Sequence, residues 1–251
     1  MLAGSHTTEL ESDLISAHPK IQLDMTRGRA GLLFVPLLFS LFPCGGGLLA
    51  QEEGPRSSAA LSAGMGVSYI NAPNVVDYLN RYASQADRVA DFTPAVEFFV
   101  APELSLSSTL VLRVEYAYLL KSYSLSGLGG IYSFEYSVHM PTAVLDYLLR
   151  GEGFYVKVGG GLGYHFGKFS YLFPNSNSEA RFTGNGIGLK LELMGNTAFG
   201  ESLYGLIGGD LRLDYIGALK DDSGNGPSQA TGNVKLRFAS AGIKFGLVYY
   251  F

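Results

Sequence analysis

The last stretch of the chain, Gly242 to Phe251, alternates between two kinds of side chain. One side of an extended strand would carry mainly small residues and Lys244. The other side would carry only large apolar or aromatic residues, namely Ile243, Phe245, Leu247, Tyr249 and Phe251. Successive side chains of a strand point to opposite faces of its sheet, so these two faces need different surroundings. A closed barrel in a lipid bilayer supplies both.

Similar alternation recurs along the chain, and none of the alternating stretches has the long apolar run of a membrane helix. The expected strands are Ala59 to Tyr69, about Pro94 to Val100, Thr109 to Tyr123, Ile131 to Leu149, Phe154 to Phe166, Gly186 to Met194, Leu203 to Leu219 and Val234 to Phe251. The pattern predicts an all-β fold, an eight-stranded antiparallel up-and-down transmembrane β-barrel.

The fourth stretch opens with a row that we expect on the apolar, lipid-facing side: Tyr132, Phe134, Tyr136 and Val138. Glu135 and His139 then fall on the opposite face. Pro141 predicts a β-bulge in this strand, and a change of phase near Ser240 predicts another in the eighth strand.

The connections between the expected strands differ in length on the two rims. Those on one rim are long and polar: 70–93, 124–130, 168–185 and 220–233. Those on the other rim are tighter: 101–108, 150–153 and 195–202. Outer-membrane barrels have long outer loops and short periplasmic turns, so we expect both termini on the periplasmic side.

Alternation alone does not decide which face is outside, because soluble eight-stranded ligand carriers also alternate, with the apolar face inward. Three features favour charges inside the barrel. The polar face is rich in glycine, which relieves crowding in a narrow lumen, tyrosines lie at the ends of the apolar face, and the chain ends on Phe251. A lipid-facing Arg or Lys at the bilayer midplane would cost about 2–4 kcal/mol.

The chain resembles the small eight-stranded outer-membrane β-barrel proteins of Gram-negative bacteria, often described as porin-family or outer-membrane β-barrel domain proteins. The resemblance covers residues 59–251 and is carried by a strand-turn-strand pattern over Ser137 to Tyr164 and by the terminal Tyr249, Tyr250 and Phe251. It implies the bacterial outer membrane as location, with outer-membrane lipid and the outer-membrane insertion machinery as partners. The insertion signal would comprise Phe245, Leu247, Tyr249 and Phe251.

Charged residues recur on the expected lumen face. They are Arg113, Glu115, Glu135, Lys157, Lys190, Glu192, Asp210, Arg212, Asp214 and Lys244. A selective pore is one interpretation, and an ion-pair network that fills the barrel is the other. The interior of an eight-stranded barrel is only just wide enough for side chains, and buried charges persist by pairing, so we favour the filled lumen.

His139 and His165 are the histidines outside the leader. Some small barrels resemble this one and act on lipid A, with a histidine, a serine and a carboxylate near the membrane surface. Here no histidine lies in the last two strands, and the serine nearest His165 downstream is Ser170. We therefore expect both histidines to satisfy polar groups in the lumen, with no catalytic residues, no metal site and no cofactor.

The amino-terminal part reads as a leader. Residues 1–24 are expected to precede the true start at Met25, and residues 25–50 resemble a secretory signal peptide with cleavage near Ala50. Residues 51–58 would form a periplasmic stub. From there to the end, Lys plus Arg nearly balance Asp plus Glu, and nothing indicates nucleic acid as a partner.

The first long connection shows helical order. Asn74 is a candidate N-cap for a short helix with a shared face formed by Val75, Val76, Leu79, Tyr82, Ala83 and Ala86. This helix would rest on the outer leaflet, close the barrel mouth or protect the rim. In the third connection, Phe169, Tyr171, Leu172 and Phe173 are candidates to pack against it.

These observations predict a non-catalytic barrel with a structural, surface-interaction or small-ligand-binding role. A narrow passive pore for small solutes is the alternative, and an enzyme acting on outer-membrane lipid is the third interpretation. The extracellular ligand is unknown.

Overall fold

The computed structural model describes residues 58–84, 88–127, 129–174, 176, 178–227 and 233–251, so the predicted leader and signal peptide lie outside the described residues. The described elements are β1 (Ala59–Asn71), α1 (Pro73–Leu79), β2 (Phe92–Ser105), β3 (Leu110–Gly127), β4 (Gly130–Gly151), β5 (Phe154–Leu172), β6 (Ala180–Ala198), β7 (Leu203–Ala218) and β8 (Lys235–Tyr250). Among these residues, no helix has the length and apolar character needed to cross a membrane.

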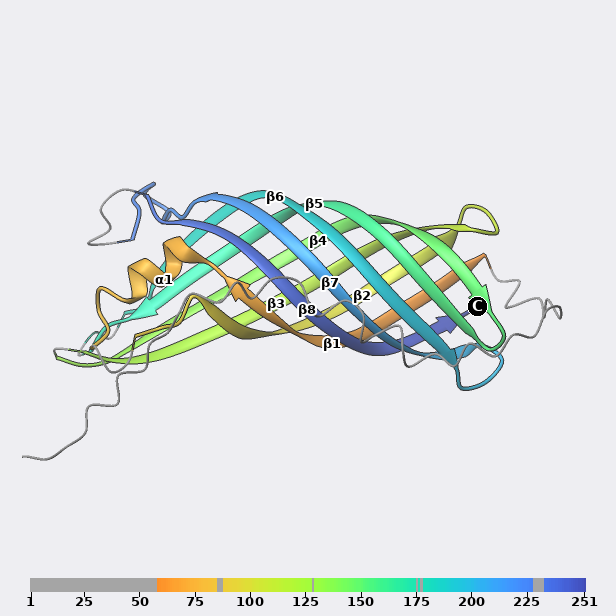
Figure 1. Ribbon diagram of the computed structural model, residues 1–251. Helices are drawn as coiled ribbons and strands as arrows, with labels where there is room; N and C mark the ends of the chain where they lie inside the picture. Colours follow the sequence, from red (N-terminus) through yellow and green to blue (C-terminus); the bar gives the residue numbers. More distant parts are fainter. Residues whose placement is uncertain (1–57, 85–87, 128, 175, 177, 228–232) are drawn as a thin grey trace, which may run out of the picture. The chain divides into compact units, whose positions relative to one another are not determined.

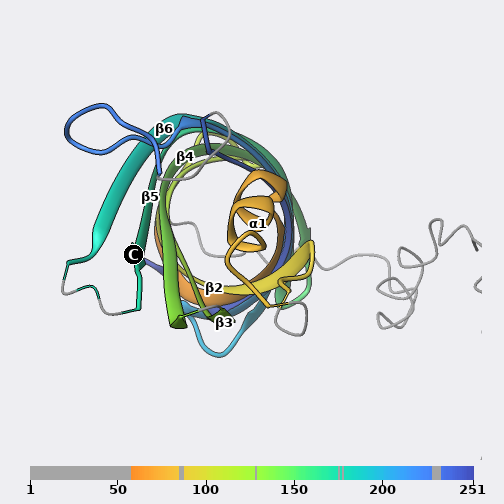
Figure 2. The ribbon, with the colours of Figure 1, turned by 90° about the vertical axis from the view of Figure 1, so that its left-hand side faces the viewer.

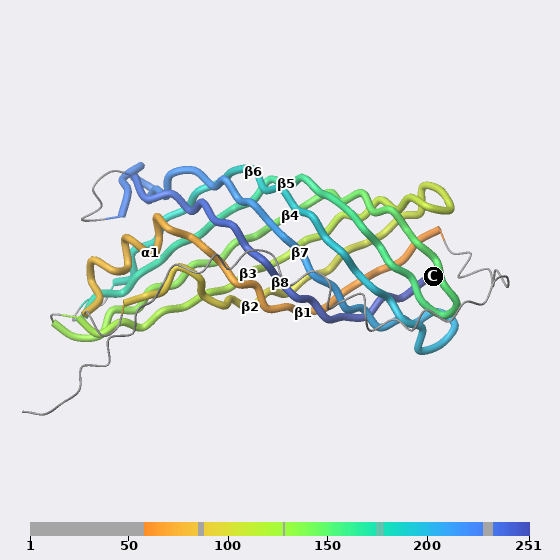
Figure 3. Tube along the Cα trace, in the orientation of Figure 1, coloured from red at the N-terminus to blue at the C-terminus, as the bar shows by residue number. Residues whose placement is uncertain are grey.

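The sheet closes on itself. Each strand pairs antiparallel with the next, and β8 returns to pair with β1 in the order β1 to β8 (Figures 1 and 3). The predicted all-β, closed eight-stranded antiparallel barrel is confirmed.

The two faces of the sheet differ as the alternation predicts over most of the barrel. Leu191 and Leu211 on the outside are 65% and 60% exposed, whereas Arg113 and Lys157 inside are 0% exposed. A soluble carrier would show the reverse. Apolar exposure on this scale requires an apolar solvent, and lipid provides it.

All eight strands are longer than a bilayer needs, and β3 to β6 are the longest in the described part of the chain. β3 to β6 contain 18, 22, 19 and 19 residues, whereas about 9–11 residues cross the hydrocarbon core. The extra length lies at the α1 end, where β3 and β4 stay paired as far as Gly127 and Gly130. The predicted long connection 124–130 is therefore a tight turn, in which Gly129 and Gly130 have φ of 118° and 133°.

The aromatic row of β4 faces inward, and the prediction that it faces lipid is wrong. Phe134, Tyr136 and Val138 are at most 2% exposed and pack in the core. Glu135 lies on the outer surface instead, where it pairs in register with Ser170. The cause is that this end of the lumen is apolar, so that hydrophobicity no longer distinguishes outside from inside.

The two predicted bulges are also wrong. β4 keeps one register with β3 and β5 through Pro141, and β8 keeps one register with β1 through Ser240. The apparent change of phase arises because Leu236 and Phe238 face the apolar end of the lumen and are buried. A register shift does occur between β7 and β8, at Tyr215 and Ala218.

α1 lies within the ring of strands, at the barrel end opposite the C-terminus (Figures 1 and 2). Ala72 occupies the N-cap position without a side-chain cap, so the predicted cap at Asn74 is wrong. Pro73 starts the helix, because its fixed φ suits the first helical turn. The buried residues of the helix are Val75, Val76, Tyr78 and Leu79. Of the predicted helical face, Ala86 lies outside the described residues.

Candidate functional site

The charged residues predicted for the lumen converge inside the barrel, with one exception. Those that lie inside and are buried are Arg113, Glu115, Lys157, Lys190, Glu192, Asp210, Arg212, Asp214 and Lys244. The exception is Glu135, which is exposed on the outer face because the row that contains it is inverted relative to the prediction.

Glu115 of β3 lies at the centre of the charge network. Its Oε2 accepts hydrogen bonds from Lys190 Nζ at 2.7 Å and Arg113 Nη1 at 3.0 Å. Its Oε1 accepts from Arg212 Nη2 and Lys244 Nζ, each at 3.0 Å. Four cations from β3, β6, β7 and β8 therefore meet one carboxylate, which binds the strands together across the lumen.

Glu97 and Asp146 also belong to the network, and the sequence analysis did not predict either of them as a lumen residue. Glu97 accepts two hydrogen bonds from Arg212, at 2.8 and 3.0 Å, and its Oε1 lies 2.8 Å from Lys244 Nζ. Asp146 accepts from Arg113 Nε at 3.1 Å. A lone acid on a strand looks the same in sequence whether it is solvated or paired. The signal that could have found both is their position on the face shared with Arg113.

The remaining acids keep every central cation paired. Asp210 Oδ2 lies 2.8 Å from Arg212 Nη2 and 3.2 Å from Lys244 Nζ, and Glu192 pairs with both Arg113 and Lys190. All these groups are almost completely excluded from solvent. Charges removed from water persist only when they are paired and hydrogen-bonded, so this arrangement is a packed plug of ions.

His165 joins a chain of three polar side chains inside the lumen. Its Nδ1 is hydrogen-bonded to Asp214 Oδ1, and its Nε2 lies 3.1 Å from Thr142 Oγ1. Gly188 makes room for the ring, since a Cβ there would overlap with His165 Cε1. The order carboxylate, imidazole, hydroxyl resembles a relay for nucleophilic catalysis, yet all three residues are at most 3% exposed. A substrate has no access to Thr142 in this packing.

His139 lies on the outer face of β4, and its predicted position in the lumen is wrong. Its Nδ1 is 2.6 Å from the Tyr116 hydroxyl, and its ring packs on Tyr118 with centroids 4.6 Å apart. Aromatic residues with polar edges are typical of the interfacial girdle of a barrel. His139 therefore lies on the opposite face of the sheet from His165 and takes no part in its polar chain.

Aromatic side chains close the α1 end of the lumen. Tyr78 of α1 makes edge contacts with Phe134 and Phe169, at centroid distances of 6.3 and 5.7 Å. Tyr82 packs on Phe134 and on Phe173, at 5.7 and 5.1 Å. Of the residues predicted to pack against the helix, Phe169, Tyr171 and Phe173 take part, since Tyr171 lies 6.4 Å from Tyr78 between ring centroids. Leu172 is 41% exposed and does not. This layer closes the barrel mouth.

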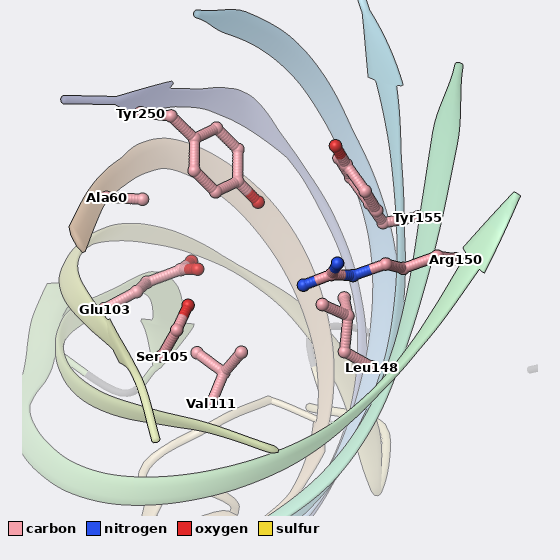
Figure 4. Close-up of a pocket in the computed structure, with 8 residues that line it drawn as sticks. All are labelled: Ala60, Glu103, Ser105, Val111, Leu148, Arg150, Tyr155 and Tyr250. Atoms are coloured by element: carbon pink, nitrogen blue, oxygen red, sulfur yellow. The ribbon is translucent and has the colours of Figure 1, made fainter. Parts of the chain in front are cut away.

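The other end of the lumen opens into a small recess with a volume of about 20 Å³ (Figure 4). Its polar lining is formed by Glu103, Ser105, Arg150, Tyr155 and Tyr250. Its floor is closed by the ion pair between Glu103 and Lys157. The recess could hold a small polar group, but it does not continue into the central charge network.

No group of His, Cys, Asp and Glu side chains in the described part of the chain could hold a metal ion. The charged lumen is therefore an ion-pair network in chemical terms, and protein cations are the partners of its carboxylates.

No protein-family model matches the chain, and no curated protein matches it in sequence. Solved structures do match its fold. Neisserial surface protein A is 13% identical with a TM-score of 0.52, and the match covers 78% of this chain and 98% of that one. Ail, the attachment invasion locus protein of Yersinia pestis, is 11% identical with a TM-score of 0.46, over 78% and 99% of the two chains. A major outer membrane protein from Thermus thermophilus is 20% identical with a TM-score of 0.45, over 77% and 100%.

The match to Neisserial surface protein A agrees with the closed eight-stranded sheet. The chain has the fold of a small eight-stranded outer-membrane β-barrel, and its apolar exterior suits a lipid bilayer.

Proposed function

We propose that this protein is a non-conducting, non-catalytic outer-membrane barrel that acts through its rims, in a structural, surface-interaction or small-ligand-binding role. The observation that carries this proposal is the ion-pair network around Glu115, which spans the lumen from β3 to β6, β7 and β8. The aromatic layer around Tyr78 adds a second closure. Two closures in series among the described residues support a lumen that is closed to solutes.

The orientation belongs to the same proposal. Both termini would be periplasmic, and the end of the barrel that carries α1 would face outward. The start of β1 and the end of β8 lie at the rim with short turns, in agreement with this orientation. The outer-face residues Phe245, Leu247, Tyr249 and Phe251 would act as the signal for the insertion machinery, and each is about half exposed or more.

Planar-bilayer recording of the purified mature protein tests the closed lumen. A larger porin reconstituted in the same bilayers serves as the positive control. We expect no discrete current steps under conditions in which the porin conducts. Stable, ion-selective steps would contradict the proposal, provided that Lys190→Glu changes their selectivity while Leu191→Ala, on the outer face of the same strand, does not.

A narrow passive pore is the alternative function. The recess at the rim with short turns would be its entrance, with Glu103 and Arg150 as the charges that solutes meet first. The Glu103–Lys157 pair at the floor argues against it, because opening a path would leave one buried charge without its partner.

Catalysis is the weakest candidate. A fold by itself does not decide whether a protein is an enzyme. The burial of His165 and Thr142 argues against an active site there. Altered lipid A acylation on expression, lost on replacing His139 or His165, would overturn this part of the proposal.

A further inference from the structure

Two exposed lysines and a threonine form a row on the outer face of the barrel, at the α1 end. Lys168 of β5 pairs in register with Thr183 of β6, and Thr183 forms a β-bridge with Lys220, just after β7. The bridge has both hydrogen bonds, at 2.8 and 2.9 Å. All three residues are exposed, and paired residues share a face of the sheet. With strands about 4.8 Å apart, the two lysine Cα atoms are separated by roughly 10 Å.

No ion pair among the described residues neutralises the positive charge of this row, although the charge of Lys168 is one of those that lower the pKa of the Glu179 carboxyl. Neither Lys168 nor Lys220 forms an ion pair there. Arg237 and Lys235 on the neighbouring β8 add to the charge, opposite Tyr215 and Ala218 of β7. None of these cations has a carboxylate within ion-pair distance among the residues that the structure describes.

The acids near the row have other partners or lie beside it. Glu179 pairs with Arg181 at 2.8 Å. Hydrogen bonds from Ser170 and Arg181 hold the pKa of the Glu179 carboxyl below its ordinary value. Asp221 Oδ1 accepts backbone hydrogen bonds from Ser223 and Asn225, while Asp222 is exposed beyond the end of the row. Glu135 pairs in register with Ser170, diagonal to Lys168.

The height of the row on the barrel is set by an aromatic belt below it. Tyr164 and Phe166 precede Lys168 on the outer face of β5, and Tyr215 precedes Lys220. These rings are 51%, 46% and 55% exposed. Lys168 lies two residues beyond Phe166, and Lys220 lies five residues beyond Tyr215. Aromatic girdles mark the membrane interface, so we place the row beyond the girdle, in the headgroup region. The aliphatic part of a lysine side chain lies along apolar surface, while its ammonium group remains in polar surroundings.

We propose that Lys168, Thr183 and Lys220 form a binding site for the phosphate group of a membrane-lipid headgroup in the leaflet at the α1 end of the barrel. The two ammonium groups supply charge-assisted hydrogen bonds, and the Thr183 hydroxyl between them supplies a third donor. The acyl chains of the same lipid would lie along the apolar outer face of β5 and β6, which includes Leu162 and Ile187. This inference depends on the transmembrane placement but not on the closed lumen.

The test measures lipid binding to the folded, detergent-solubilised mature barrel by native mass spectrometry. The probes are bisphosphorylated lipid A, its dephosphorylated form and inorganic phosphate. The variant is Lys168→Gln/Lys220→Gln. Its matched control is Arg81→Gln/Arg88→Gln, which removes two exposed arginines outside the row. Lys168→Arg/Lys220→Arg retains the charge, and Lys220→Gln alone is the variant to use if the double variant fails to fold.

We expect the double Gln variant to bind bisphosphorylated lipid A about thirtyfold more weakly, since each surface cation contributes about 1 kcal/mol. The Arg81/Arg88 control and the Arg variant should bind like the wild type. The dephosphorylated lipid should bind weakly to all of them. Equal binding by the wild type and the double Gln variant, or equal losses in that variant and in its control, would overturn the proposal. If equimolar inorganic phosphate competed with the lipid, the claim that the bound phosphate belongs to a lipid headgroup would be contradicted. If bilayer recordings showed that the lumen conducts ions, the proposed function would be contradicted, but the outcomes expected for lipid binding would not change.

Discussion

Arg212 of β7 and Glu97 of β2 form a two-point ion pair across the lumen, with Nη2 to Oε1 at 2.8 Å and Nη1 to Oε2 at 3.0 Å. The two strands are not neighbours in the sheet. This pair therefore spans the barrel interior, and it fixes the planar guanidinium against the carboxylate in the geometry that gives the strongest hydrogen bonds.

Breaking this pair on one side should destabilise the barrel strongly. Arg212→Met leaves Glu97 buried without its two-point partner, and the expected loss in the free energy of unfolding is about 3–5 kcal/mol. Urea titration in detergent micelles measures it. The double variant Glu97→Gln/Arg212→Met should recover part of the loss, because the carboxylate that lost its two-point partner is then removed as well. A loss in the double variant equal to the sum of the single losses would show that the pair is not coupled.

Substitution at Gly188 should displace His165. A Cβ at this position would overlap with the imidazole Cε1, so Gly188→Ala forces the ring away from Asp214 and Thr142. We expect a loss of about 1–3 kcal/mol, as for other overpacked cores. Gly195→Ala on the same strand is the matched control, because the atom nearest to a Cβ added at Gly195 would lie 3.9 Å away. Equal stability of the two variants would argue against tight packing around His165.

Removing the Tyr78 ring should loosen the α1 closure without opening the sheet. Tyr78→Ala deletes the contacts with Phe134 and Phe169. Trypsin cleavage after Arg81 or Arg88 should then accelerate about tenfold or more, since a local loss of only about 1.4 kcal/mol gives that factor. Tyr118→Ala, on the outer face of β3, is the control and should leave cleavage unchanged. Cleavage of Tyr78→Ala at the wild-type rate would mean that the aromatic layer does not hold the helix.

Deleting Phe251 should impair insertion in cells while leaving the folded barrel nearly intact. The ring of Phe251 is 72% exposed and contacts Tyr249 at a centroid distance of 5.2 Å, so it contributes little to the core. Cell fractionation should show less of the deletion variant than of the wild type in the outer membrane. The purified variant should refold normally in detergent. Phe199→Ala removes another exposed aromatic ring near the same rim and should insert normally. Normal surface assembly of the deletion variant would count against the insertion signal.

Alternation in the sequence was sufficient to predict the strands and most of their faces, because the middle of this barrel places charged side chains inside and apolar ones outside. It failed where both faces are similar. At the α1 end, Phe134, Tyr136 and Phe238 line an apolar interior, while Ser133 and Glu135 face outward beyond the membrane. Hydrophobicity then points to the wrong face, and the false bulges at Pro141 and Ser240 follow from the same error.

The candidate site, too, could be predicted only in part from the sequence. The cations of the lumen could be predicted individually from alternation, but their partners Glu97 and Asp146 depend on strand register and barrel closure, which single-strand patterns do not contain. The chain of Asp214, His165 and Thr142 joins three strands, and no local spacing in the sequence indicates it. The row of Lys168, Thr183 and Lys220 likewise exists only because β5, β6 and the end of β7 are neighbours.

The central claim is that apolar side chains face lipid and that the other face is sealed inside. Phe98 and Phe99 of β2 test it directly, because they lie side by side at one depth, and Phe98 is 47% exposed whereas Phe99 is 5% exposed. The chain contains no tryptophan, so Phe98→Trp and Phe99→Trp each introduce a single fluorophore. In bilayers of phospholipid brominated on the acyl chains, Phe98→Trp should be strongly quenched and Phe99→Trp should not. Equal quenching of the two, or quenching of Phe99→Trp alone, would contradict the assignment of the faces.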